Sequence, residues 1–208
     1  MVGDAAGAPR GVFVNCPFDP SFEQLMDAIF FTIVASGFRP RSSIESGAQA
    51  DLRVERILTA LNDSPYSVHD LSRSIGEGPE NLARFNMPLE LGMAIQLRHS
   101  QVKSQHPEPH DFFIMTGVHA DYGRFASDLR GYDIEPHGEE TEALVSRLVE
   151  WLQTKRGAAS NATKPDILQA LPYFLEAKKK KVAAVGRVWK QLVVVATEIA
   201  EAHLPAVP

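Results

Sequence analysis

The chain contains very little cysteine, because Cys16 is the only one among its 208 residues. A single cysteine cannot form a disulfide within the chain, and scarce cysteine is typical of proteins in a reducing compartment. No histidine adjoins Cys16 in the sequence, and a lone cysteine at a strand end is more often a small buried residue than a nucleophile. We therefore expect a cytoplasmic protein without an intrachain disulfide.

Long hydrophobic runs are also absent. The most apolar late segment, residues 182–204, is interrupted by charged side chains, among them Arg187, Lys190 and Glu198, which excludes a membrane-spanning helix. The first ten residues lack the apolar core that follows a basic start in a secretory signal. We therefore expect no membrane partner.

Positive charge is not in excess. The chain has 21 Lys and Arg against 26 Asp and Glu, for a net charge of −5. A nucleic-acid surface needs clustered Lys and Arg over a domain, so we expect no nucleic-acid partner. The four lysines at 178–181 are expected near the junction of two helices, where such a run is more often a solvated face or helix end than a phosphate patch.

The glycine-rich loops that bind phosphates in many enzymes are missing too. The sequence has neither the P-loop pattern nor the GxGxxG turn, so an ATPase or a dehydrogenase has no local support. Of the seven histidines, His106 and His110 flank prolines in an expected loop, and no cysteine or acidic cluster completes a metal site. We predict no metal and no cofactor.

What the sequence does have is a regular alternation of short apolar runs with segments of helical period. This pattern predicts an α/β domain whose five-stranded parallel sheet is covered by helices on both faces. The expected strands lie at 12–14, 38–43, 66–69, 112–115 and 132–134, and the expected helices at 19–36, 51–61, 87–99, 122–129 and 139–154. Asp19 is the expected cap of the first helix, and Gly37 is expected to end it.

The predicted domain covers residues 11–155, followed by a linker at 156–163 and a helical extension at 164–208. The last helix is expected to present a broad apolar side formed by Val185, Val188, Trp189, Leu192, Val195, Ala196 and Ile199. Such a side must be covered by the domain or by a partner chain. We favour self-association, hence a homodimer or larger homo-oligomer, because helices at a chain end are common dimer elements.

Residues 84–94, which read RFNMPLELGMA, place one carboxylate in the first turn of an otherwise apolar helix. Asn86 is expected to cap this helix, and Pro88 is tolerated where amides lack helical partners. The helix dipole favours the ionised form of Glu90 that a nucleophile or general base needs, and Gly92 leaves room for a ligand. Alternatively, Glu90 only complements the dipole.

In open parallel sheets, ligands bind beyond the carboxyl ends of the strands. Asp70 follows the third expected strand, and we expect Asp70 and Glu90 to flank one crevice. Paired carboxylates at a sugar are the usual means of breaking a glycosidic bond. Taken alone, Asp70 would more often be a turn or helix cap.

The remaining candidates also follow strands. Asn15 and Phe18 could hydrogen-bond and stack on a base or ribose, and Arg41 or Arg73 could hold a phosphate or carboxylate. Taken alone, Phe18 would more often be a core residue. The full predicted substrate-binding set is Asn15, Phe18, Arg41, Glu45, Arg73 and Asn86.

Four segments together carry a family resemblance. They are residues 12–18 (VFVNCPF), 37–41 (GFRPR), 69–73 (HDLSR) and 85–92 (FNMPLELG). They resemble an uncharacterised bacterial family that is similar to nucleoside 2-deoxyribosyltransferases, nucleotide N-glycosidases and, more distantly, TIR domains. The likeness covers about residues 11–155 and implies a flavodoxin-like fold.

By this resemblance Glu90 is the nucleophile and Asp70 the sugar-binding or acid–base partner. The implied function is a hydrolase or transferase acting on the N-glycosidic bond of a nucleotide or nucleoside, with NAD among the candidates, in a bacterial defence or stress system. Residues 15–18 replace the glycine-rich phosphate loop of the transferases, so the substrate is not carried over. The alternative is a non-catalytic nucleotide-sensing or protein-interaction module that oligomerises through its C-terminal helices.

Overall fold

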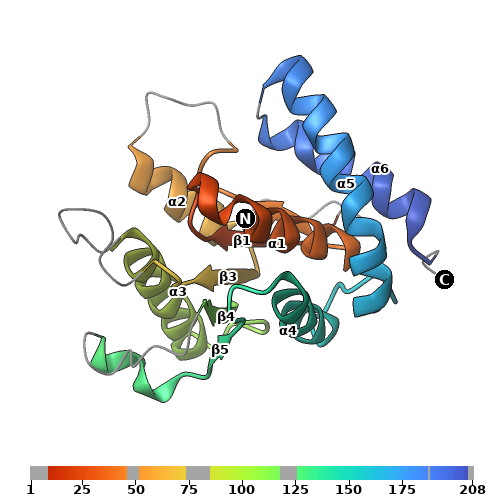
Figure 1. The fold of residues 1–208 in the computed structure, drawn as a ribbon. Coiled ribbons are helices and arrows are strands. Elements are labelled where there is room, and N and C mark those ends of the chain that lie inside the picture. Colours follow the sequence, from red (N-terminus) through yellow and green to blue (C-terminus); the bar gives the residue numbers. More distant parts are fainter. Residues whose placement is uncertain (1–8, 46–51, 74–84, 118–125, 187, 206–208) are drawn as a thin grey trace.

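The protein is built around a five-stranded parallel sheet with the strand order β2-β1-β3-β4-β5 (Figure 1). The computed structural model describes residues 9–45, 52–73, 85–117, 126–186 and 188–205. The strands are β1 (Gly11–Asn15), β2 (Arg39–Arg41), β3 (Tyr66–Asp70), β4 (Asp111–Thr116) and β5 (Ile134–Pro136). This is the strand order of flavodoxin-like α/β domains, so the predicted fold class is confirmed.

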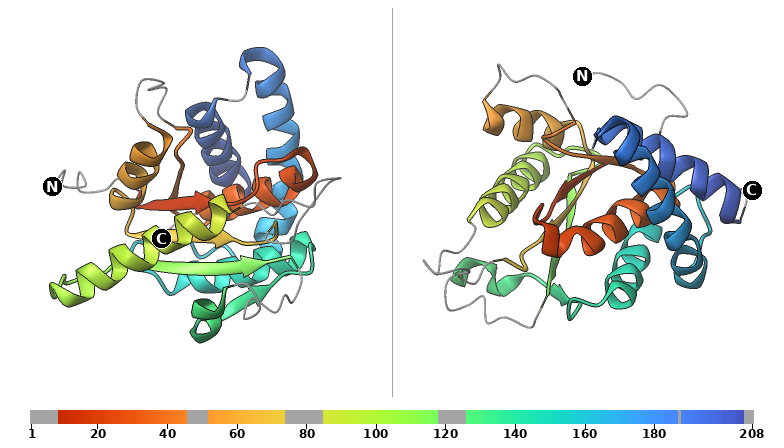
Figure 2. Two further views of the ribbon diagram at one scale, coloured as in Figure 1. Left: turned by 90° about the vertical axis from the view of Figure 1, so that its left-hand side faces the viewer. Right: turned by 45° about the horizontal axis from the view of Figure 1, so that its top comes forward.

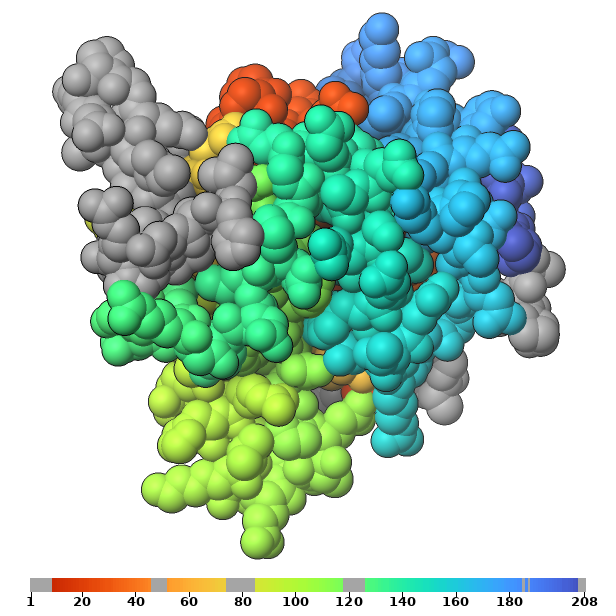
Figure 3. All heavy atoms as spheres, turned by 60° about the horizontal axis from the view of Figure 1, so that its bottom comes forward, coloured from red at the N-terminus to blue at the C-terminus, as the bar shows by residue number. Residues whose placement is uncertain are grey.

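Helices cover both faces of the sheet (Figure 2). One face carries α2 (Arg53–Asn62) and α3 (Asn86–Lys103), and the other carries α1 (Glu23–Ala35), α4 (Thr141–Gln153), α5 (Lys164–Val185) and α6 (Trp189–His203). On the surface, α4 and α5 lie side by side (Figure 3). None of the described helices combines the length and hydrophobicity needed to cross a membrane.

The side chains of β1 explain why both faces are covered. Val12 and Val14 belong to the larger core, which includes residues of α1, α4, α5 and α6. Phe13 instead packs with Ile57 of α2 and Ala94 of α3. Because successive side chains of a strand point to opposite faces, a strand that is apolar on both faces must be buried between two helical layers.

The two C-terminal helices belong to the larger core. Phe174 of α5 stacks on Phe31 of α1 with ring centres 5.1 Å apart, and the indole N–H of Trp189 donates to the backbone carbonyl of Pro40 at 3.0 Å. The buried residues of α6 are Trp189, Leu192, Val195 and Ala196. Part of the apolar side that led us to expect self-association is therefore covered by the chain itself, whereas Val188 on that side is 45% exposed, and self-association stays a prediction.

The first helix begins and ends close to where the sequence predicts. Asp19 is a cap, since its Oδ1 accepts a bond from the Phe22 amide at 3.1 Å, but the turn it caps is the short 3-10 helix η1 (Pro20–Phe22), which precedes α1. Gly37 follows α1 with φ of +85°, and a Cβ there would lie 2.8 Å from Ala159. Glycine therefore permits both the turn and the close approach of the segment joining α4 to α5.

Other boundaries differ from the prediction. The second strand is shorter, covering only β2. α3 continues past the expected end at residue 99, because its last polar residues occupy a largely exposed helical turn. β5 begins later than expected, since the Tyr132 amide closes a turn on the Leu129 carbonyl at 3.0 Å. Of the helix expected at 122–129, residues 122–125 lie outside the described residues, and the rest overlaps the 3-10 helix η3 (Ser127–Gly131).

Lys178 corrects the expectation that the lysine run is solvated near a helix junction. The run lies inside α5, and the buried Lys178 Nζ contacts Asp27 Oδ2 at 2.5 Å and Glu23 Oε1 at 2.8 Å, both on α1. A charged side chain is rarely buried unless it is paired. Because Asp27 lies 151 positions away in the sequence, no local pattern could reveal this ion pair.

Replacing Lys178 by Ala is expected to lower the free energy of unfolding by about 3 kcal/mol, because it leaves the buried Asp27 without its ammonium partner. Urea denaturation followed by circular dichroism measures this change. Lys179, which is exposed on the same helix, provides the matched control, and Lys179→Ala should stay within about 0.5 kcal/mol of the wild type. Equal stability of the two variants would contradict a stabilising role for the buried pair.

Candidate active site

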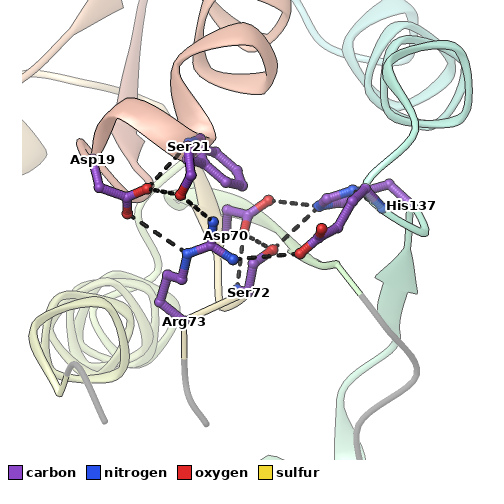
Figure 4. Close-up of polar contacts among 8 residues, drawn as sticks. Asp19, Ser21, Asp70, Ser72, Arg73 and His137 are labelled. Carbon is purple, nitrogen blue, oxygen red and sulfur yellow. Dashed lines mark hydrogen bonds and ion pairs between the residues drawn. The ribbon is translucent and has the colours of Figure 1, made fainter. Parts of the chain in front are cut away.

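A cluster of polar side chains gathers beyond the carboxyl ends of the strands, where ligands of such sheets bind (Figure 4). Asp70 ends β3, and Ser72 and Arg73 occupy the turn that follows it. His137 comes directly after β5, and Asp19 lies just before η1. Segments far apart in the sequence therefore meet at one edge of the sheet.

Asp70 is fully buried, and its carboxylate accepts three hydrogen bonds. Oδ1 accepts from the Ser72 amide at 2.9 Å and from Ser72 Oγ at 2.5 Å, and Oδ2 lies 2.9 Å from His137 Nε2. Oδ2 has a second lone pair to spare, but Asp70 is 0% exposed, so a ligand could reach it only if the surrounding groups moved. Asp70 therefore organises the cluster. Its bond to the Ser72 amide is that of a turn residue, the alternative role that we considered for it from the sequence.

His137 is a residue that the sequence analysis missed. Its Nδ1 accepts a bond from the Glu139 amide at 3.1 Å, so the ring proton is on Nε2, which donates to Asp70. Ser72 Oγ lies 3.4 Å from the same Nε2. In a Ser-His-Asp triad the serine and the aspartate use different ring nitrogens, so this cluster is not a triad. If the fifth strand had been predicted at 134–136 instead of 132–134, His137 would have stood directly after it, where site residues are expected.

Arg73, which we expected to hold a phosphate or carboxylate, already contacts two carboxylates. Its guanidinium lies 3.6 Å from Asp19 Oδ2 and 3.3 Å from Glu139 Oε1, and Nη2 donates to Ser21 Oγ at 2.9 Å. The guanidinium carbon also lies 5.7 Å from the centre of the Phe22 ring. Arg73 therefore ties η1 to the segment after β5 instead of standing open to a ligand.

The cluster is tightly packed at the end of β4. A Cβ on Gly117 would lie 3.1 Å from Glu139 Cγ and 3.2 Å from Ser72 Oγ. Both distances are shorter than ordinary van der Waals contact, so a side chain would push these groups apart. Glycine therefore lets the backbone after β4 approach the cluster.

Glu90 has the opposite environment to Asp70. It lies in α3 with only 6% of its surface exposed, and it forms no hydrogen bond or ion pair with the residues that the structure describes. Burial raises the pKa of Glu90 to about 7, although the charge of Arg53 acts to lower it. The helix dipole was expected to keep Glu90 ionised, but desolvation outweighs the favourable charges.

Asn86 does not cap α3 as predicted. The N-cap position belongs to Phe85, and no side chain bonds to the first-turn amides there. Asn86 is the first residue of the helix and its side chain is exposed. Its hydrogen-bonding groups are therefore available near the start of the helix that carries Glu90.

Asn15, predicted to bind substrate, anchors the start of α3. Its side chain is buried, and Nδ2 donates to His69 Nδ1 at 2.9 Å and to the Met87 carbonyl at 2.9 Å. Both amide hydrogens are thus used within the protein. Only the Oδ1 atom of Asn15 remains as an acceptor, so its main contribution is to hold α3, and with it Glu90, against β1 and β3.

The hydrogen bond between Asn15 and His69 is the first in a buried chain of hydrogen bonds. His69 Nε2 donates to Ser67 Oγ at 2.8 Å, and Ser67 Oγ donates to His110 Nε2 at 2.8 Å. His110 Nδ1 donates to the Ser64 carbonyl at 2.9 Å. Burial lowers the pKa of His69 to about 3 and also lowers that of His110, so both rings are neutral, as this pattern of donors and acceptors requires.

The other predicted binding residues do not join the Asp70 cluster. Arg41 and Glu45 bond to each other at 2.6 Å beside the edge strand β2, and the Glu45 carboxylate also pairs with Arg39. Phe18, 38% exposed, lines a small apolar cavity with Ile44 and residues of α1, α5 and α6. Strand β1 therefore lies between Arg41 and Asp70, and Phe18 faces a set of side chains that does not include Asp70.

Cys16 links the two predicted carboxylates electrostatically. Burial raises the pKa of its thiol well above the ordinary value, and the charges of Asp70 and Glu90 raise it further. Both carboxylates therefore lie within electrostatic reach of the end of β1, while the thiol itself stays protonated and unreactive. Among the described residues, no group of histidine, cysteine and acidic side chains has the arrangement of a metal site.

The buried neutral histidines predict that the protein loses stability in acid. The pKa of His69 is lowered in the folded state, so the unfolded chain takes up a proton near pH 6.5 that the folded protein resists until about pH 3. Glu90, whose pKa is raised, acts in the opposite direction as pH falls from about 7. A comparison with a variant at His69 alone separates the two effects.

His69→Gln retains a side-chain acceptor and donor but cannot ionise. Urea denaturation at pH 7 and pH 5 should show that the wild type loses about 2 kcal/mol more unfolding free energy than this variant over the interval. Ser67 and Asn15 stay unchanged in both proteins, so only the titration differs. An identical pH dependence of the two proteins would show that His69 is not held neutral.

Comparisons with known proteins assign no family to this chain. No protein-family model matches it, and no curated protein is significantly similar to it. The resemblance to deoxyribosyltransferase-like and TIR-like proteins therefore stays a prediction, and the function is inferred from the site itself.

Proposed function

We propose that the protein is a hydrolase or transferase acting on the N-glycosidic bond of a nucleotide or nucleoside, with Glu90 as the reacting carboxylate. The observation that carries this proposal is the isolated, buried carboxyl of Glu90, whose pKa is about 7 and which has no partner among the described residues. Burying an ionisable group without a partner costs free energy, and such groups concentrate at functional sites. NAD and nucleoside monophosphates are the candidate substrates.

The proposed mechanism assigns different roles to the two carboxylates. Glu90, when ionised, attacks the sugar C1′ or stabilises positive charge that develops on the sugar as the base leaves. The hydrogen bonds of Asn15 hold the start of α3, which keeps the Glu90 carboxylate in place during the reaction. Asp70 serves as a positioning residue that orients Ser72 and His137, rather than as the group that contacts the sugar directly.

The internal hydrogen bonds of Asp70 and Arg73 favour one alternative function, that of a module that binds a nucleotide without cleaving it. A glycosidase of the usual kind needs a second carboxylate free to transfer a proton, and Asp70 is already bonded to three donors. A module that binds a nucleotide without cleaving it needs no such group. In that case the ligand would bind without releasing a free base.

We place either activity in the cytoplasm, where Cys16 would stay reduced.

The decisive variant is Glu90→Gln, incubated beside the wild type with nucleosides, nucleoside monophosphates and NAD. Chromatography measures the release of free base, and the rate of this release should fall by on the order of 10³-fold in the variant. Glu198→Gln, a change at an exposed position of α6, is the matched control and should retain full turnover. Binding of these compounds without base release by the wild type would support the binding module instead.

The pH profile of the wild type gives a second test. If Glu90 acts as an ionised nucleophile, kcat/KM should rise with pH and level off above an apparent pKa near 7. If Glu90 acts as an acid, kcat/KM should fall through the same region. A profile that is flat between pH 6 and pH 8 would contradict a reacting role for Glu90.

The folding of Glu90→Gln can be checked independently. The raised pKa means that ionised Glu90 is unfavourable in the folded protein above pH 7, whereas Gln stays neutral. Urea denaturation at pH 8 should therefore find the variant at least as stable as the wild type, so lost turnover cannot be attributed to unfolding.

A further inference from the structure

A cation-rich groove lies beside the edge strand β2, between α2 and the start of α6. These two helices lie on opposite faces of the sheet (Figure 2). Its volume is about 590 Å³, which is within the range of small-molecule sites. It is lined by residues of three elements and the loop after β2, among them Arg39, Arg41, Glu45, Arg56 and Lys190.

The charge of this groove is opposite to that of the whole protein. Of the described side chains that line it, four are cationic, namely Arg39, Arg41, Arg56 and Lys190, and two, Glu45 and Glu55, are anionic. Full ionisation of these six described side chains gives a charge of +2, in a chain whose net charge is −5. A cationic groove in an acidic protein attracts small anions selectively.

Part of this charge already binds a carboxylate. Glu45 Oε2 accepts a bond from Arg41 Nε at 2.6 Å, and its other oxygen pairs with Arg39. One carboxylate therefore sits between two guanidinium groups. A single negative charge between two guanidinium groups leaves the two arginines with a positive excess.

The remaining cations of the groove have unused donors. The Nε of Arg56 is buried and has no hydrogen-bond partner in the described part of the chain. Lys190 forms no ion pair with the described residues and is exposed at the start of α6. The Nε itself is too buried for a ligand in the groove to reach, but Arg56 also lines the groove and forms no ion pair with the described residues, so a bound anion would be a partner for its charge.

We propose that this groove binds a phosphate-bearing small molecule through Arg56, Lys190 and the positive excess of Arg39 and Arg41. Phosphate offers several acceptor oxygens and up to two charges, which fits planar guanidinium donors together with an ammonium. The mostly polar lining favours the phosphate group over an apolar ligand. A free phosphate chain and the phosphates of a nucleotide share this chemistry.

This site does not depend on the proposed reaction at Glu90. The residues of α2 that line the groove are Glu55, Arg56, Thr59 and Ala60, whereas Ile57 and Leu61 of the same helix pack toward Ala94 of α3. Helix α2 therefore stands between the groove and the helix that carries Glu90. A ligand in the groove would act as an additional or regulatory ligand.

Isothermal titration of the whole protein with pyrophosphate, at constant ionic strength, tests the proposal. We expect saturable binding of one pyrophosphate, weakened about tenfold or more in both Arg56→Gln and Lys190→Gln, since each loses a charge-assisted bond. Lys180→Gln removes the same charge at an exposed position of α5 outside the groove and should bind as the wild type does. Both Lys190 and Lys180 are exposed, so neither variant should unfold.

Further titrations show where the ligand binds and whether it is a free phosphate or a nucleotide. Glu90→Gln should bind pyrophosphate normally; if it loses binding while the groove variants keep it, the ligand lies at the Glu90 site and the groove proposal is wrong. ADP binding as tightly as pyrophosphate would identify the phosphates as the recognised group, and tighter binding of ADP would identify a nucleotide. Absence of saturable binding, or equal weakening by Lys180→Gln, would also overturn the proposal.

Discussion

The hydrogen bonds of one side chain, Asn15, hold together the elements on which the site depends. From the end of β1 its amide donates to His69 on β3 and to the carbonyl of Met87 at the start of α3. This requires an unprotonated Nδ1 on His69, which burial ensures by lowering the pKa of that ring. Buried polar groups are costly when unpaired, so the arrangement of the sheet and α3 that keeps both Asn15 bonds is favoured. That arrangement fixes the position of Glu90 on α3.

The two carboxylates near the end of β1 show how environment divides roles between similar groups. Asp70 accepts three hydrogen bonds and organises a cluster that includes Ser72 and His137. Glu90 is nearly as buried but has no such bonds in the described part of the chain, so desolvation raises its pKa to about 7. The first carboxylate stabilises the fold around it, whereas the second is kept at a cost in free energy and is able to gain or lose a proton near neutral pH.

Much of the fold could be predicted because its signals are local. The alternation of apolar runs and helical segments correctly indicated five parallel strands with helices on both faces, since a strand such as β1 is apolar on both sides. Boundaries were less accurate where a turn competes with a strand, as at Tyr132. The partners of Lys178 and the bond of His137 to Asp70 depend on residues far away in the sequence, so no local pattern could reveal these pairings.

The sequence by itself determined the class of the fold, the position of Glu90 near the start of a helix, and the placement of Asn15 and Asp70 at strand ends. These follow from periodicity and turn chemistry, which act between neighbours in the chain. Only the tertiary structure decided that Asp70 and Arg73 are bonded internally, that Glu90 has a raised pKa, and that Trp189 and Leu192 of α6 join the core of their own chain. Burial and long-range pairing decide these properties, because desolvation depends on what surrounds a group in space.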